Sequence, residues 1–167
     1  MKPIRIVFVC LGNIVRSPLA EHMFMDLAKQ AGLEDKYQTD SAGTAAYHIG
    51  ESPDLRMRQV ASEFGLVYDG KGRQFLGKDF EDFDLIVPMD TDNQFNVLKL
   101  AGHKTLEKKV SLMRDFDPKA AKNGSVPDPY YGGIDGFVNV YKIVERSCQG
   151  LLEAIEKGKI QFEYSDS

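Results

Sequence analysis

The run Ile4-Arg-Ile-Val-Phe-Val9 leads directly into Cys10-Leu-Gly-Asn-Ile-Val-Arg16-Ser17-Pro18, and this junction decides the fold. The first six residues are mostly apolar and β-branched, which predicts a central strand buried on both faces. Gly12 ends the apolar run. Ser17 is a good helix N-cap and Pro18 suits the first helical position, so a helix is predicted to follow at once. The stretch therefore predicts a strand, a short loop and a helix start.

The predicted loop has a cysteine at one end and an arginine at the other. Five residues separate Cys10 from Arg16, a length at which backbone N–H groups can converge on one centre and form a nest for an oxyanion. The dipole of the following helix adds positive potential, which favours the thiolate of Cys10 as a nucleophile. Arg16 can hold two phosphate oxygens with its planar guanidinium. The candidate phosphate-binding residues are Leu11, Gly12, Asn13, Ile14, Val15 and Arg16.

The rest of the chain alternates predicted strands with predicted helices. Gly32 ends the first helix. Such alternation implies a parallel sheet covered on both faces, with ligands bound beyond the carboxyl ends of its strands, where Cys10 lies. The sequence thus predicts a small, doubly wound α/β domain. Its further predicted elements are strands at 37–41, 84–89 and 109–113 and helices at 53–64, 91–101 and 134–157.

The length and composition fit one soluble globular domain, predicted to span residues 1–167 with a loose tail at 159–167. With 43% hydrophobic and 28% charged residues, the chain is neither disordered nor a membrane protein by composition. Apolar runs are too short to span a membrane, and the first three residues lead into a strand rather than a signal peptide. Two cysteines on different elements favour a reducing cytoplasm over a disulfide framework.

Charge and histidine spacing argue against two further classes of protein. A net charge of −4 gives no support for binding to nucleic acid, although a few groups can still make one pocket positive. The histidines His22, His48 and His103 lie far apart without the spacing of metal ligands. We therefore expect no metal and no cofactor.

Several motifs together resemble those of one known family. Cys10–Pro18 is similar to the C-x5-R-S signature loop of the low-molecular-weight protein tyrosine phosphatases, and Asp128-Pro-Tyr-Tyr-Gly-Gly133 resembles their general-acid loop. Ser41-Ala-Gly-Thr44, Pro53-Asp-Leu-Arg56 and Met89-Asp90 match further landmarks, so the likeness covers essentially the whole chain. The resemblance implies a four-stranded parallel sheet and hydrolysis of phosphotyrosine and small aryl phosphates through a phosphocysteine.

The resemblance also implies a role for each catalytic residue. Cys10 attacks phosphorus, Arg16 and the loop N–H groups bind the equatorial oxygens, and Asp128 protonates the leaving phenolate and then activates water. Ser17 either caps the helix, as physics alone favours, or donates to the cysteine sulfur, as the resemblance favours. Asn13 either holds the loop in a strained shape or is an ordinary turn residue.

Three tyrosines are candidate walls for a flat phenyl phosphate: Tyr47, Tyr130 and Tyr131. Tyr47 lies where many relatives carry tryptophan or another bulky residue. The expected partners are phosphotyrosine-containing proteins, with inorganic phosphate or vanadate as inhibitors. We expect the protein to act as a monomer or a weak dimer, without nucleic acid or membrane.

The chain departs from the family pattern at two positions. Val15 stands where many relatives have a second loop cysteine, which bears on protection of Cys10 against oxidation. Gly70 stands where relatives often have a histidine, before the basic segment Lys71-Gly-Arg-Gln74, and this bears on hydrogen bonds that support the loop.

Three alternative functions share part of this pattern. A protein arginine phosphatase characteristically has threonine where Ile14 stands. An arsenate reductase needs further cysteines, and besides Cys10 this chain has only Cys148. A phosphopeptide-binding module would be expected to lose Cys10 or Asp128, and both are present. The pattern favours phosphotyrosine hydrolysis.

Overall fold

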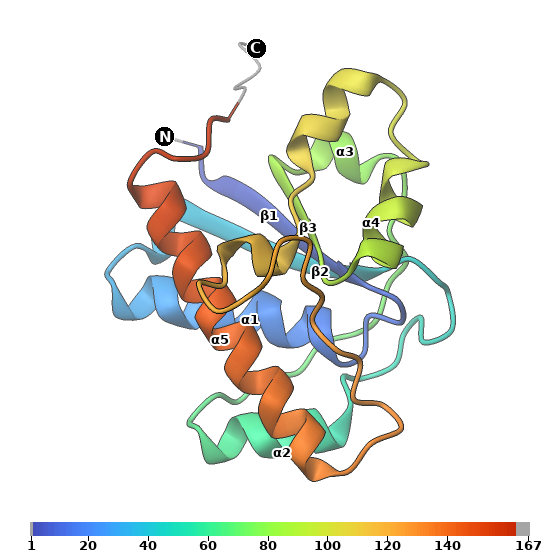
Figure 1. The fold of residues 1–167 in the computed structure, drawn as a ribbon, viewed down its shortest axis with the longest axis vertical. Helices are drawn as coiled ribbons and strands as arrows, with labels where there is room; N and C mark the ends of the chain where they lie inside the picture. The colour runs from blue at the N-terminus through green and yellow to red at the C-terminus, as the bar shows by residue number, and fades with distance from the viewer. Residues whose placement is uncertain (1, 163–167) are drawn as a thin grey trace.

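A computed structural model describes residues 2–162, with a parallel sheet at the centre (Figure 1). Its strands are β1 (Ile4–Cys10), β2 (Tyr37–Gly43) and β3 (Leu85–Pro88), and they lie in the order β2-β1-β3. Both neighbours pair with β1 in parallel register, so β1 is the central strand. All of its residues except Arg5 are buried, as its apolar sequence predicts.

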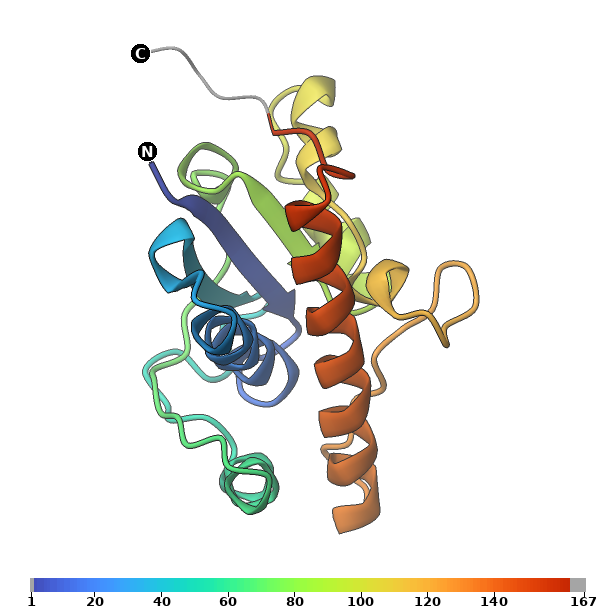
Figure 2. The ribbon, with the colours of Figure 1, turned by 90° about the vertical axis from the view of Figure 1, so that its left-hand side faces the viewer.

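Helices cover both faces of this sheet, which confirms the predicted α/β arrangement (Figures 1 and 2). On one face, α1 (Arg16–Gln30) packs against α5 (Ile134–Glu156), and α2 (Leu55–Glu63) lies against α5. The other face is covered by α3 (Asp79–Asp82) and α4 (Thr91–Leu98).

Alternate residues of β1 divide the core between the two faces. Ile6 and Phe8 belong to the large cluster under α1 and α5, whereas Val7 and Val9 belong to the smaller cluster under α3 and α4. This alternation follows from the two-residue period of a strand. Because both faces of the strand are covered, every side chain along it is apolar apart from the half-buried Arg5.

The predicted fourth strand at 109–113 is wrong. The 3₁₀ helices η2 (Lys104–Lys109) and η3 (Met113–Phe116) take up both ends of that segment. Between them, Val110 forms one isolated parallel bridge with Ile86, and Ser111 donates its N–H to the carbonyl of Ile86 at 3.0 Å. The extended stretch is too short for a ladder, so the described residues form three strands, and this stretch adds only one of three isolated bridges.

The remaining helix and strand predictions agree with the structure to within a few residues, and η1 (Glu34–Lys36) is a short addition before β2. Carboxylates cap two of the helices: Asp54 accepts N–H bonds at the start of α2, and Asp90 does so at the start of α4. These caps satisfy backbone donors that the first helical turn leaves without an intrahelical partner.

The C-terminal residues described by the structure follow α5. Ile160 and Phe162 pack against the main core cluster, and residues 163–167 of the predicted loose tail lie outside the described residues. Within residues 2–162, no helix is both long enough and apolar enough to cross a membrane.

Candidate active site

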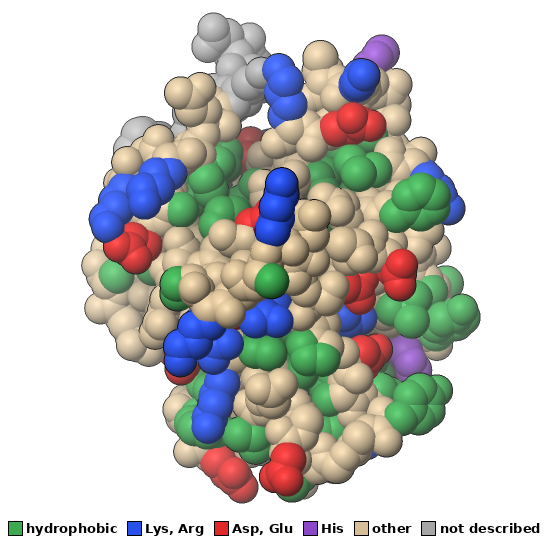
Figure 3. All heavy atoms as spheres, viewed as in Figure 1, with side chains coloured by type: hydrophobic (Ala, Val, Ile, Leu, Met, Phe, Trp, Pro, Cys, Tyr) green, Lys and Arg blue, Asp and Glu red, His purple; other side chains and the backbone are tan. Residues whose placement is uncertain are grey.

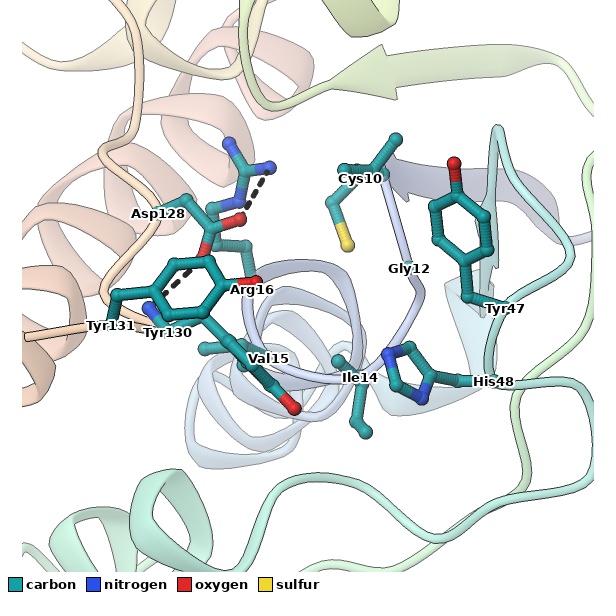
Figure 4. Close-up of a pocket in the computed structure, with 11 residues that line it drawn as sticks. Cys10, Gly12, Ile14, Val15, Arg16, Tyr47, His48, Asp128, Tyr130 and Tyr131 are labelled. Atoms are coloured by element: carbon teal, nitrogen blue, oxygen red, sulfur yellow. Dashed lines mark hydrogen bonds and ion pairs between the residues drawn. The ribbon is translucent and has the colours of Figure 1, made fainter.

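The loop between β1 and α1 forms the floor of a cavity of about 350 Å³ (Figure 4). β1 brings Cys10 to the carboxyl edge of the sheet, and its sulfur points into this cavity. The side chain is almost completely buried, with 3% of its surface exposed. The residues that line the cavity are Cys10, Leu11, Gly12, Ile14, Val15, Arg16, Tyr47, His48, Asp128, Tyr130 and Tyr131. The predicted site residues are thus brought together, with Asn13 and Ser17 just beneath.

Ser17 contacts the sulfur of Cys10 rather than capping α1. Its Oγ lies 3.0 Å from the cysteine Sγ, 3.4 Å from the carbonyl of Ala42, and accepts a bond of 2.9 Å from the amide of Asn13. The helix begins at Arg16, two residues earlier than predicted, and its N-cap residue Val15 makes no side-chain cap. The N-cap expectation is therefore wrong, because the hydroxyl is directed to the cysteine. A hydroxyl in this position can donate to a thiolate and stabilise it.

Asn13 holds the loop from below. Its backbone is left-handed, with φ of 53°, a conformation that asparagine tolerates better than most residues. Its amide donates to Ser17, and its carbonyl oxygen accepts the backbone N–H of Arg73 at 2.9 Å. Of the two interpretations open from sequence, these bonds favour the loop-holding one.

Two glycines let the loop fold tightly. A Cβ on Gly43, the last residue of β2, would lie 2.8 Å from the carbonyl oxygen of Leu11 and 3.0 Å from the amide nitrogen of Asn13. A Cβ on Gly12 would lie 2.9 Å from the ring of His48. Gly43 therefore has to be glycine for close approach of the loop backbone, whereas a Cβ at Gly12 would displace the His48 ring.

Arg16 is fixed against the far side of the cavity. Its side chain is 4% exposed, and Nη1 donates to Asp90 at 2.7 Å and to the carbonyl of Val126 at 3.0 Å. Its Nη2 lies 3.7 Å from Asp128, at the cavity. Because both short bonds use Nη1, the remainder of the guanidinium fork is available to an anion beside Cys10.

Asp90 belongs to the landmark Met89-Asp90 but was not predicted to be a site residue. It follows β3 directly, so it occupies the same carboxyl edge of the sheet as Cys10. One of its oxygens accepts from Arg16 and the other caps α4 at Asn93. The rule that parallel sheets bind ligands at this edge was the signal that could have identified it.

Asp128 reaches the cavity from the loop before α5. Its side chain is 45% exposed, and one oxygen accepts the backbone N–H of Tyr130 at 3.1 Å. Two residues earlier, Val126 is fastened at both sides: its N–H donates to Met89 at 2.8 Å and its carbonyl accepts from Arg16. The carboxylate is thus held near Arg16 and near the sulfur, while it stays in contact with solvent.

The tyrosines stand on opposite sides of the cavity, with the Cys10 sulfur between them (Figure 4). Tyr130 and Tyr131 meet edge to face, with ring centroids 5.0 Å apart, and the Arg56 guanidinium lies 5.3 Å from the Tyr130 ring. Tyr47 and Tyr131 project furthest, with 75% and 98% of their surfaces exposed. Hydrophobic side chains also gather on the surface around the loop after β2 (Figure 3). The walls suit a flat apolar group at the cavity mouth.

His48 also lines the cavity wall, although it was not predicted to be a site residue. Its Nδ1 pairs with Glu51, and its ring centroid lies 6.4 Å from that of Tyr130. The signal in the sequence is its position next to the wall candidate Tyr47. Among residues 2–162, no cluster of three His, Cys, Asp or Glu side chains is placed to hold a metal ion.

Comparison with known proteins gives one consistent result. The family model described as low molecular weight phosphotyrosine protein phosphatase matches residues 5–161. A low molecular weight protein-tyrosine-phosphatase of Streptomyces coelicolor is 41% identical over 92% of this chain and 94% of its own. The human low molecular weight phosphotyrosine protein phosphatase is 36% identical over 89% of this chain and 93% of its own.

A solved structure agrees with these relatives. The protein tyrosine phosphatase of Entamoeba histolytica, crystallised with Hepes in its active site, superimposes with a TM-score of 0.89 at 40% identity. The match covers 93% of this chain and 99% of the other. Family model, relatives and fold coincide over nearly the whole length, and the chain belongs to the low molecular weight phosphotyrosine protein phosphatase family.

Proposed function

We propose that this protein hydrolyses phosphotyrosine in proteins, and small aryl phosphates, through a phosphocysteine formed on Cys10. One observation carries the proposal most directly: the Cys10 sulfur, the Arg16 guanidinium and the Asp128 carboxylate converge on a single cavity. Membership of a family of cysteine-dependent tyrosine phosphatases supports the same chemistry.

In the first step, the Cys10 thiolate attacks phosphorus. A P–S bond forms while the bond from phosphorus to the phenolic oxygen breaks, and Asp128 gives that oxygen its proton. The backbone N–H groups of residues 11–16 and the guanidinium of Arg16 bind the equatorial oxygens and stabilise their charge in the transition state. Support for this assignment comes from the sulfur's place at the cavity floor, with Ser17 at 3.0 Å.

In the second step, water replaces the cysteine on phosphorus. Asp128, now ionised, accepts a proton from the water; the P–S bond breaks and inorganic phosphate leaves. A carboxylate that serves in both steps must reach the cavity and also meet solvent. The half-exposed Asp128, 3.7 Å from Arg16, meets both requirements.

The aromatic walls favour an aryl substrate. A phenyl ring that leaves the cavity would pass between Tyr47 on one side and Tyr130 on the other, where stacking stabilises it. Ile14 lines the same cavity with a bulky aliphatic side chain, which favours phosphotyrosine over phosphoarginine.

The partners and cellular setting complete the proposal. Phosphotyrosine-containing proteins are the proposed substrates, and phosphate and vanadate should compete for the cavity because both are tetrahedral oxyanions. Both cysteines are free thiols, which fits a reducing cytoplasm. We propose a monomer or a weak dimer, with the exposed Tyr131 ring available for weak association.

A matched pair of peptides tests the substrate assignment. The wild-type protein should release phosphate from a phosphotyrosyl peptide and leave the same peptide with phosphoarginine intact, and Cys10→Ser should release none from either. Ile14→Thr is the informative variant, because it introduces the side chain that is typical of arginine phosphatases. Release from phosphoarginine alone by the wild-type protein would contradict the proposal.

A further inference from the structure

Beneath the cavity, a chain of hydrogen bonds runs from Cys10 to a residue on a different segment. Its first links are the contact between Cys10 and Ser17 at 3.0 Å and the bond from Asn13 to Ser17 at 2.9 Å. The next link is the backbone N–H of Arg73, which donates to the side-chain carbonyl of Asn13 at 2.9 Å. The same residue accepts the N–H of Gly43 at 2.8 Å, so Arg73 is joined both to the phosphate loop and to the end of β2.

Backbone hydrogen bonds hold part of the segment that supplies this link: Gly72 donates its N–H to Glu51 at 2.9 Å and accepts that of Gly50 at 2.8 Å. Gly70 has a φ of 155°, which other residues rarely adopt, and a Cβ on Gly72 would lie 2.3 Å from the carbonyl oxygen of His48. Glycines allow the segment to pass this close, but they also give it more conformations to lose on folding. The backbone bonds of Gly72 oppose this freedom, and the side chain of Arg73 adds a second attachment for the same segment.

The guanidinium of Arg73 provides this second attachment. It binds Asp79 of α3 through two bonds, of 3.0 and 3.1 Å, and Asp40 of β2 through a bond of 3.0 Å. Burial by itself lowers the pKa of Arg73, but the hydrogen bonds and charges of Asp79 and Asp40 outweigh it and raise that pKa. The side chain of Asp79 is only 7% exposed, so this is a partly buried clamp rather than a surface ion pair.

We propose that Arg73 is a positioning residue for the nucleophile, which clamps its own segment to Asp40 and Asp79 so that its backbone N–H orients Asn13, and through Asn13 and Ser17 the Cys10 sulfur. The inference rests on the proposed function, since it concerns the residue that attacks phosphate. None of these links requires Arg73 to touch substrate. The clamp also explains why arginine is needed in the basic segment 71–74, because a planar fork can meet two carboxylates at once.

The test compares Arg73→Met and Arg73→Lys with wild type and with the matched control Arg5→Met. Arg5 pairs with Asp84 at 3.5 Å elsewhere on the sheet, so its loss removes an arginine–aspartate pair without reaching the loop. The readouts are thermal stability, the rate of Cys10 alkylation by iodoacetate as a function of pH, protection by inorganic phosphate, and kcat and KM for nitrophenyl phosphate.

We expect Arg73→Met to lower kcat/KM by about 10- to 100-fold, as displacement of a reacting group by up to about 1 Å does. Alkylation of Cys10 should become slower at neutral pH and phosphate protection weaker. Arg73→Lys should fall between Arg73→Met and wild type, because one ammonium cannot replace a two-sided fork. Arg5→Met should match wild type in all four readouts.

A double-mutant cycle asks whether Arg73 acts through Asn13. In an Asn13→Ala background, Arg73→Lys should reduce alkylation and kcat/KM by no more than about twofold, because the link is already broken. If the double variant instead showed the product of the two single-variant losses, Asn13 and Arg73 would act independently, and the inference would be overturned. Folded Arg73 variants that lose thermal stability but keep wild-type alkylation would also overturn it, because a purely structural role predicts that pattern. Alkylation needs no turnover, so a wild-type protein without phosphatase activity would refute the proposed function and leave this test intact.

Discussion

The replacement Glu21→Gln should change how the stability of the protein depends on pH. Glu21 lies on α1 and accepts a hydrogen bond of 2.6 Å from the hydroxyl of Ser41 on β2. Burial raises the pKa of its carboxyl from the ordinary 4.5 to about 7, and the nearby charge of Asp40 adds to the effect. Glutamine keeps an oxygen acceptor for Ser41 but has no charge to desolvate.

The direction in which stability changes with pH follows from whether the folded or the unfolded state binds the Glu21 proton more tightly. Between pH 4.5 and about 7 the folded protein holds a proton that the unfolded chain has lost, so the free energy of unfolding falls as the pH rises through this range. At about 1.4 kcal/mol per pH unit, the loss due to Glu21 approaches about 3 kcal/mol by pH 7 to 8. Glu21→Gln should therefore be more stable than wild type by up to about 3 kcal/mol at pH 8, with the difference vanishing near pH 4.

Urea unfolding at intervals from pH 4.5 to 8 measures this difference. His22, 3.5 Å from Glu21, has a pKa lowered by burial, and its contribution to stability rises with pH, in the opposite direction. We therefore compare the free energy of unfolding of the variant with that of the wild type at each pH. The control is Glu63→Gln, because Glu63 is an exposed glutamate on α2. A Glu21→Gln difference that stays constant from pH 4.5 to 8 would refute the reasoning.

Three further predictions concern the loop, the acid and oxidation. Gly43→Ala should weaken phosphate binding measured by calorimetry, because its Cβ would lie 2.8 Å from the backbone oxygen of Leu11; wild-type affinity would contradict this close approach. Asp128→Ala should slow the hydrolysis of phosphotyrosine more than that of nitrophenyl phosphate, by about 10²–10⁴-fold where the leaving group needs a proton. Equal losses of rate across a series of leaving groups would show that Asp128 has a structural role instead. Peroxide should inactivate the enzyme with only partial recovery by thiol, because Val15 offers no sulfur and Cys148, on α5, is buried against α1; peptide mapping that finds a Cys10–Cys148 disulfide would be the contrary result.

The strand, loop and helix around Cys10 could be predicted because each local signal agreed with the others. A continuous apolar run, a glycine-containing loop and Pro18 all pointed to the same junction. Most of the predicted site residues line one cavity, because the carboxyl edge of a parallel sheet gathers residues that are distant in sequence.

The errors have specific physical causes. The hydroxyl of Ser17 suits a helix cap, but the nearby sulfur and Asn13 compete for it, and no local pattern reveals that competition. The segment 109–113 has the composition of a strand, yet 3₁₀ turns on both sides leave it a single bridge to Ile86. Asp90 and Arg73 act through contacts with loops more than 50 residues away in the chain, and a single sequence does not show such pairs.

The central claim is that Cys10 carries phosphate during turnover. Its most direct test is rapid alkaline quenching of the protein during turnover of nitrophenyl phosphate, since a P–S bond is labile in acid, followed by mass spectrometry of the peptide that contains residue 10. The account predicts phosphate bound to Cys10, formed as fast as the initial burst of nitrophenol and absent from Cys10→Ser. Steady release of phosphate with Cys10 unmodified, or with the label on another residue, would contradict the account.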